Sequence, residues 1–152
     1  MVLLYQNKIM AEIFNFSDAV RIGLHATLLL AHSSQRLTIG ELAKMLGCSP
    51  AHLAKVLGQL EKADVVQAKT GLGGGYLLAR PPAEITLLMV YEAIAGKLSV
   101  RRCPLAVPVC SGNGCPLGPF FRRFNREVLA QLNKTTLQDI KLKLGVINET
   151  KT

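Results

Sequence analysis

Apolar residues recur at helical spacing through much of the chain. Residues 17–32 predict a helix that is apolar nearly all round, with Ser17 and Asp18 as candidates for its N-terminal cap. Because such a helix exposes apolar side chains in several directions, other elements must cover it on several sides. The rest of the domain is therefore expected to pack around it.

The next segment has the pattern of a helix-turn-helix. Thr38 followed by Glu41 forms a capping box that begins one helix, and Gly47 ends that helix. After a tight turn, Ser49 caps a second helix that has Pro50 at its first position. The buried side of this second helix is expected to carry Leu53, Val56, Leu57 and Leu60.

A hairpin and a further helix follow. Residues 65–69 and 76–79 are predicted strands on either side of a glycine-rich tip at 71–75, and together they form a wing. Helical spacing of apolar residues then predicts another helix between 85 and 96. Residues 1–96 are therefore predicted to form a winged helix-turn-helix domain that includes the N-terminal helix.

The remaining chain divides into a loop, helices and a tail. Residues 97–118 contain three cysteines among prolines and glycines and predict an irregular loop, and residues 145–152 predict a frayed tail. Residues 119–144 predict a long amphipathic helix and a short closing helix. The apolar stripe of the long helix consists of Phe120, Phe121, Phe124, Val128 and Leu132. The predicted fold class is mainly α with a small β-hairpin wing.

Composition narrows the classes of function. The chain has 152 residues, of which 49% are hydrophobic and 18% charged, so it can bury a core. A formal net charge of +8 favours a polyanionic partner. We expect a cytoplasmic protein with no membrane partner, because no apolar run approaches the roughly 20 residues of a membrane span and the first residues lack a signal-peptide pattern.

The second helix of the pair and the wing have the features of a DNA reader. A helix that enters the major groove needs exposed polar residues in its first turns, and Ser49, His52 and Lys55 meet this need. In the wing, Lys69 precedes a glycine run that includes Gly74 and Gly75. Residues without side chains let the backbone approach DNA closely. A solvated helix face and a plain tight turn are the alternatives.

Three cysteines share the predicted loop. Cys103, Cys110 and Cys115 are separated by six and four residues, so their thiolates can converge on one inorganic centre. The spacing contains no Cys-x-x-Cys pair, which favours an iron-sulfur cluster over zinc. Residues 97–126 carry six Lys and Arg and no Asp or Glu, and positive charge stabilises thiolates. Zinc and metal-free redox thiols are the alternatives.

The most specific strings are Leu42-Ala43, Cys48-Ser49-Pro50, Leu53, Val56-Leu57, Leu60 and the run from Gly73 through Gly74, Gly75 and Tyr76 to Pro82. With them, the chain resembles the BadM/Rrf-type bacterial winged-helix transcription regulators, a family that includes the iron-sulfur regulators IscR and NsrR. The resemblance implies a homodimer held by the long helix and an operator in double-stranded DNA as partner. It also implies that Pro50 lies on the recognition helix and Tyr76 in the wing.

The resemblance further implies a 2Fe-2S or 4Fe-4S cluster with a fourth ligand outside the loop. Asp18 resembles the position from which NsrR-like members supply a carboxylate to the partner chain's cluster, although it is also a candidate cap of its own helix. The histidine that follows the third cysteine in IscR-like members is absent. His52 departs from the residue types expected at its position, so the resemblance does not imply an operator sequence.

The combined prediction is a homodimeric DNA-binding transcriptional regulator and not an enzyme. It acts as a repressor that senses nitric oxide, redox state or iron-sulfur status through a cluster on Cys103, Cys110 and Cys115. A cluster-free thiol-switch repressor of the same family is one alternative. An iron-sulfur carrier or electron-transfer protein is another, and it predicts a bound cluster without salt-dependent DNA binding.

Overall fold

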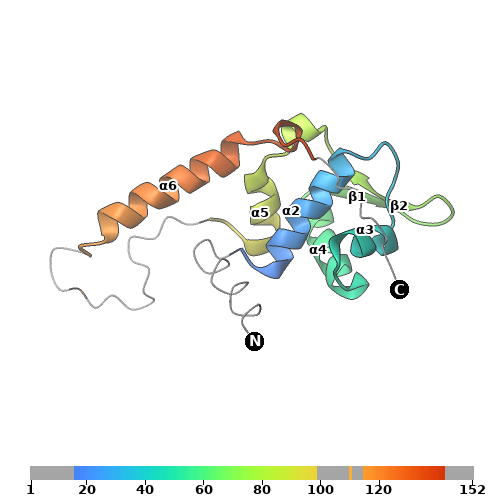
Figure 1. Ribbon diagram of the computed structural model, residues 1–152, viewed down its shortest axis with the longest axis horizontal. Coiled ribbons are helices and arrows are strands. Elements are labelled where there is room, and N and C mark those ends of the chain that lie inside the picture. The colour runs from blue at the N-terminus through green and yellow to red at the C-terminus, as the bar shows by residue number, and fades with distance from the viewer. Residues whose placement is uncertain (1–15, 99–109, 111–114, 143–152) are drawn as a thin grey trace, which may run out of the picture.

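The computed structural model describes residues 16–98, 110 and 115–142. Its described part is mainly helical, with one two-stranded antiparallel sheet (Figure 1). The elements are, in chain order, α2 (Asp18–Ala31), α3 (Ile39–Leu46), α4 (Pro50–Lys62), β1 (Val66–Lys69), β2 (Gly75–Leu78), the 3-10 turn η1 (Pro82–Glu84), α5 (Leu87–Ala95), α6 (Gly118–Lys134) and the 3-10 turn η2 (Leu137–Asp139). The predicted fold class is confirmed.

The ends of the helix pair follow the capping signals in the sequence. The Thr38 hydroxyl accepts from the backbone N–H of Glu41 at 3.3 Å, and the Glu41 carboxylate accepts from the N–H of Thr38 at 2.8 Å. Gly47 ends α3 with φ 63°, in the left-handed region that glycine tolerates best. Ser49 then caps α4, accepting from the N–H of His52 at 3.2 Å. These local signals therefore determine where the turn lies.

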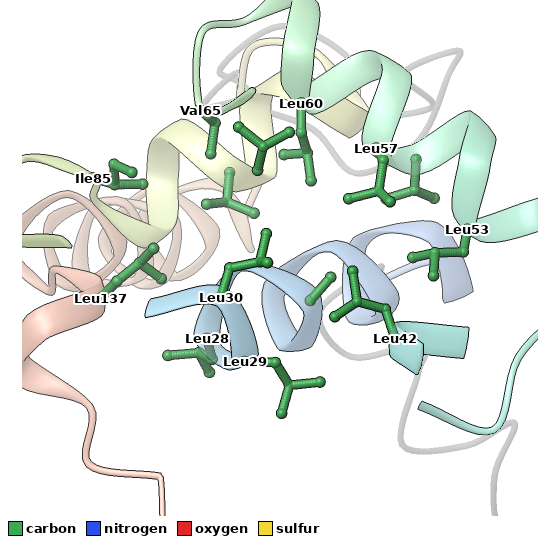
Figure 2. Packing of buried hydrophobic residues seen from close by; sticks show 14 of the residues in the cluster. Leu28, Leu29, Leu30, Leu42, Leu53, Leu57, Leu60, Val65, Ile85 and Leu137 are labelled. Atoms are coloured by element: carbon green, nitrogen blue, oxygen red, sulfur yellow. The ribbon is translucent and has the colours of Figure 1, made fainter. Parts of the chain in front are cut away.

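Helix α2 lies in the middle of the domain, packed against α3, α4, α5 and β2. Its buried residues cover most of its circumference, as the sequence pattern predicted: Val20, Gly23, Ala26, Thr27, Leu28, Leu29 and Leu30. Figure 2 shows side chains of α2 meeting Leu42 of α3 and Leu53 and Leu57 of α4. The hydroxyl of the buried Thr27 donates to backbone carbonyls one turn earlier, at 3.0 Å, so the core contains no unpaired hydroxyl there.

The segment before α5 differs from its prediction. Ile85, expected inside the helix, instead precedes it in an extended conformation, and Thr86 caps the helix by accepting from the N–H of Met89 at 3.2 Å. Ile85 is fully buried, and its carbonyl accepts from the N–H of Leu137 at 2.9 Å. Long-range pairing with Leu137 of η2 therefore outweighs the helical spacing at this position (Figure 2).

Helix α6 leaves the body of the domain. Its C-terminal end is joined to the core through η2, whose Leu137 is fully buried, and the helix packs against α5. Its N-terminal end points away from the other helices (Figure 1). Gly118 is the one buried residue of α6 among those described. The amphipathic helix predicted from the sequence therefore has most of its surface uncovered by the other described residues of its chain.

Candidate DNA interface and ligand residues

Helix α4 is buried on one side and exposed on the other. Leu53, Val56, Leu57 and Leu60 are buried, as predicted. On the opposite side, Lys55 is exposed and His52 is half-buried, and Ser49 and Pro50 are exposed at the start of the helix. The structure thus brings these four predicted DNA-contact residues together on the first turns of one helix.

The wing is a hairpin tied to the helix pair. Strands β1 and β2 pair from Val66 with Leu78 to Lys69 with Gly75, so β1 begins one residue later than predicted and β2 lies one residue earlier than predicted. Tyr76 also bridges to Leu37, the residue before the cap of α3. The hairpin is therefore held in a fixed position beside α3.

Glycines of the wing are required by close backbone packing. A Cβ atom on Gly74 would lie 2.5 Å from the carbonyl oxygen of Lys69, and one on Gly75 would lie 2.8 Å from that of Leu37. Gly75 also has φ 132°, which side chains rarely permit. Their contact with DNA stays a prediction, and the hairpin alone explains why these positions lack side chains.

Two contacts made by charged side chains brace the wing, and the sequence pattern did not reveal either. The Arg80 guanidinium donates to a carboxylate oxygen of Asp64 from Nε at 3.1 Å and from a terminal nitrogen at 2.7 Å. The Glu61 carboxylate accepts from the N–H of Ala68 at 3.3 Å. Burial of its ring, with a smaller contribution from the Glu61 charge, raises the pKa of Tyr76. The Tyr76 phenol therefore keeps its proton at neutral pH.

A groove of about 540 Å³ runs between α2 and the turn of the helix pair. Its walls are Asp18, Arg21, Ile22 and His25 from α2, and Met45, Leu46, Gly47, Cys48, Ser49 and His52 from the turn and the start of α4. The groove therefore joins the residue predicted as an outside ligand to the residues predicted to read DNA. Sequence spacing alone gave no sign of this juxtaposition.

Asp18 is not the cap of its helix. Ser17 caps α2 by accepting from the N–H of Val20 at 3.3 Å, and Asp18 is the exposed first residue of the helix. Its carboxylate forms an ion pair with Arg21, one turn along. An exposed carboxylate held by one arginine is accessible to a second chain. Its role as a ligand stays a prediction.

The cysteine loop lies largely outside the described residues, and so does Cys103. Cys110 is exposed and Cys115 is half-buried just before α6. Among the residues described, no three His, Cys, Asp or Glu side chains gather as a metal site. The predicted ligand set, one member of which cannot be placed, stays a prediction.

Within the same described ranges, every helix falls short of the length and apolar character that crossing a membrane requires.

Known proteins share this architecture. The sequence model of the Rrf2 family, described as iron-dependent transcriptional regulator, matches residues 16–142. A protein of Aquifex aeolicus, provisionally assigned as a helix-turn-helix transcriptional regulator, is 31% identical over 129 residues, which span 82% of this chain and 90% of the relative. The transcriptional regulator IscR of Pectobacterium atrosepticum is 27% identical over 110 residues, 72% of this chain and 67% of that protein.

A solved structure is also similar. CymR, the global cysteine regulator of Bacillus subtilis, superposes with a TM-score of 0.69 and 26% sequence identity, covering 81% of this chain and 92% of that chain. Both the helices and the hairpin are therefore part of a shared regulator architecture.

Proposed function

Because the chain belongs to the Rrf2 family of DNA-binding transcriptional regulators, which are not enzymes, we propose that it is a homodimeric repressor whose cysteine loop senses nitric oxide, redox state or iron-sulfur status. The observation that carries this proposal is the groove whose walls include Asp18 together with Ser49 and His52. A change at the ligand residue therefore has a short physical route to the DNA-reading helix.

The DNA interface consists of the start of α4 and the wing. Ser49, Pro50, His52 and Lys55 lie together on the exposed side of α4, and Lys69 is exposed at the end of β1. A helix of this kind enters the major groove with its N-terminal residues at the base edges, while lysines contact phosphates. Gly74, Gly75 and Tyr76 support the wing that follows the adjacent minor groove.

The donor set suits an iron-sulfur cluster. Cys103, Cys110 and Cys115 would supply three thiolates in a segment without acidic residues, and Asp18 of the second protomer a carboxylate. Exposed Cys110 and half-buried Cys115 are both accessible to such a group. A bound cluster would supply a centre that reacts with oxidants and nitric oxide, and an oxygen ligand, weaker than thiolate, favours lability.

The second protomer would pack on α6. Phe120 on this helix is 64% exposed, and its ring lies 5.5 Å from that of Phe121 and 6.3 Å from that of Phe124, between centroids. An amphipathic helix that projects from its own domain needs a partner surface for its apolar stripe. A two-fold dimer would also place two recognition helices at a fixed separation, as operators with two half-sites require.

A metal-free thiol switch is the second candidate. This candidate is favoured by the similarity to CymR, a global cysteine regulator. The two chains share 26% sequence identity and superpose with a TM-score of 0.69. In this version Cys103, Cys110 and Cys115 would respond by reversible oxidation. Bound iron and acid-labile sulfide in anaerobically isolated protein distinguish the two candidates.

The DNA interface is tested by removing one charge from α4. We expect Lys55→Ala to weaken binding to an operator selected from a random duplex library, and to flatten its salt dependence by about one ion, because one phosphate contact is lost. Lys134→Ala removes the same charge from the exposed end of α6 and should leave binding unchanged. Equal effects of the two substitutions would overturn this placement of the interface.

A further inference from the structure

Leu72 occupies an unusual place for a large apolar side chain. It is fully exposed and lies in the turn between β1 and β2, at the tip of the wing. Figure 1 shows this turn extending away from the helices. A single exposed leucine is ordinary on a protein surface. Leu72 differs because it lies at the tip of the wing. In the proposed interface, this tip is the part of the protein that reaches toward the minor groove.

The backbone around Leu72 leaves its side chain unshielded. The N–H of Gly74 donates to the carbonyl of Gly71 at 2.9 Å, which closes a four-residue turn with Leu72 in its second position. Gly73 in the third position has φ 68°, as a type II turn requires. Glycines therefore flank Leu72 on both sides, and neither supplies a side chain that could cover it.

The tip is held at a defined place and lies near positive charge. The bridge between Leu37 and Tyr76 ties the wing to α3, so the turn is anchored close to its base. Lys69, exposed at the end of β1, lies three residues before Leu72. A lysine beside an apolar tip would hold the phosphate backbone while the apolar group contacts the bases.

We infer that Leu72 is an apolar wedge that inserts at a base step in the minor groove and bends the operator. The inference rests on the proposed contact between wing and DNA. Leucine is among the side chains that partly unstack a base step and kink a duplex by about 20° or more toward the major groove. Pyrimidine–purine steps open most easily, so Leu72 would confer a preference for such a step at the flank of each half-site.

The test uses an operator selected from a random duplex library with the wild-type protein. 2-Aminopurine is placed in turn at each flanking position, and its fluorescence is read at saturating protein so that affinity does not affect the signal. We expect fluorescence to rise at one step in each half-site with the wild-type protein and with Leu72→Met, and not with Leu72→Ala. Leu72→Ala should also weaken binding about tenfold, as expected when burial of a leucine side chain is lost.

A coupling measurement supplies the control. Replacing the pyrimidine–purine step by an A-tract step should weaken wild-type binding and leave Leu72→Ala binding unchanged, while Thr70→Ala, on the same turn, behaves like the wild type. Equal penalties for wild type and Leu72→Ala, or no unstacking by the wild type, would overturn the wedge while DNA binding itself persists. A wild-type protein that selects no operator would overturn both the wedge and the proposed function.

Discussion

Leu37 and Tyr76 exchange both of their backbone hydrogen bonds, at 3.2 Å from the N–H of Leu37 and at 2.8 Å from the N–H of Tyr76. Leu37 lies just before the capping box of α3, and Tyr76 lies in the second strand of the wing. The pair is a single antiparallel bridge between the hairpin and the segment before α3. Through it, the wing and the helix pair form one unit with a fixed relative position.

Gly75→Ala is expected to disrupt this connection. A Cβ at position 75 would lie 2.8 Å from the carbonyl oxygen of Leu37, and φ there is 132°. Because the obstacle is backbone and the conformation is strained for alanine, we expect the free energy of unfolding to fall by about 1–3 kcal/mol. Urea denaturation followed by circular dichroism measures the change.

Gly58→Ala is the matched substitution and should act in the opposite direction. Gly58 lies inside α4, and a Cβ there would meet no atom within 4 Å. Alanine costs less backbone entropy than glycine in a helix, so stability should rise by about 0.5–1 kcal/mol. If both variants lose stability equally, the clash at position 75 is not the reason for its effect.

The capping box of α3 should make stability depend on pH in the acid range. The backbone N–H of Thr38, with help from its hydroxyl, lowers the pKa of Glu41 below its ordinary value of 4.5. The unfolded chain therefore binds this proton more tightly than the folded protein, so the stabilisation is present above the ordinary pKa and is lost as pH falls through the lowered pKa. Wild type should be more stable than Glu41→Gln at pH 7, and the difference should shrink below pH 4.5. A difference independent of pH would count against the box.

Phe120→Glu should separate the protomers. The ring is 64% exposed within one chain, so the substitution leaves the domain core intact while placing a charge in the proposed dimer contact. We expect sedimentation to show a shift from dimer to monomer and operator binding to weaken. Asn133→Glu adds the same charge at an exposed position of the same helix, on the side away from the apolar stripe, and should remain dimeric. A dimeric Phe120→Glu protein would exclude α6 as the contact.

How far the sequence predicts the structure depends on the range of the interaction. Thr38, Gly47 and Ser49 act on backbone groups within a few residues, so the ends of α3 and α4 could be predicted closely. Ile85 could not be placed, because its extended conformation comes from pairing with Leu137, more than 50 positions along the chain. Local helical spacing contains no information about such a partner.

In the candidate site too, features that depend on nearby residues can be predicted from the sequence, and features that depend on distant residues cannot. The exposed side of α4 follows from helical periodicity, so the sequence alone predicts that His52 and Lys55 lie on one side with Ser49. The groove that Asp18 and Ser49 both line depends on how α2 packs against the helix pair, and no pattern in the sequence specifies that packing. Ser17 and Asp18 both have side chains that can cap a helix, so the sequence leaves both as candidates. In the structure Ser17 is the cap.

Anaerobic isolation of the wild-type protein and of a variant with Cys103, Cys110 and Cys115 replaced by alanine tests the sensing account most directly. Iron, acid-labile sulfide and operator affinity are measured on both proteins and on wild type stripped by a chelator. We predict near-stoichiometric iron and sulfide in the wild type alone, and an operator affinity that differs between loaded and stripped protein. Iron-free wild type that binds its operator as the alanine variant does would contradict the account.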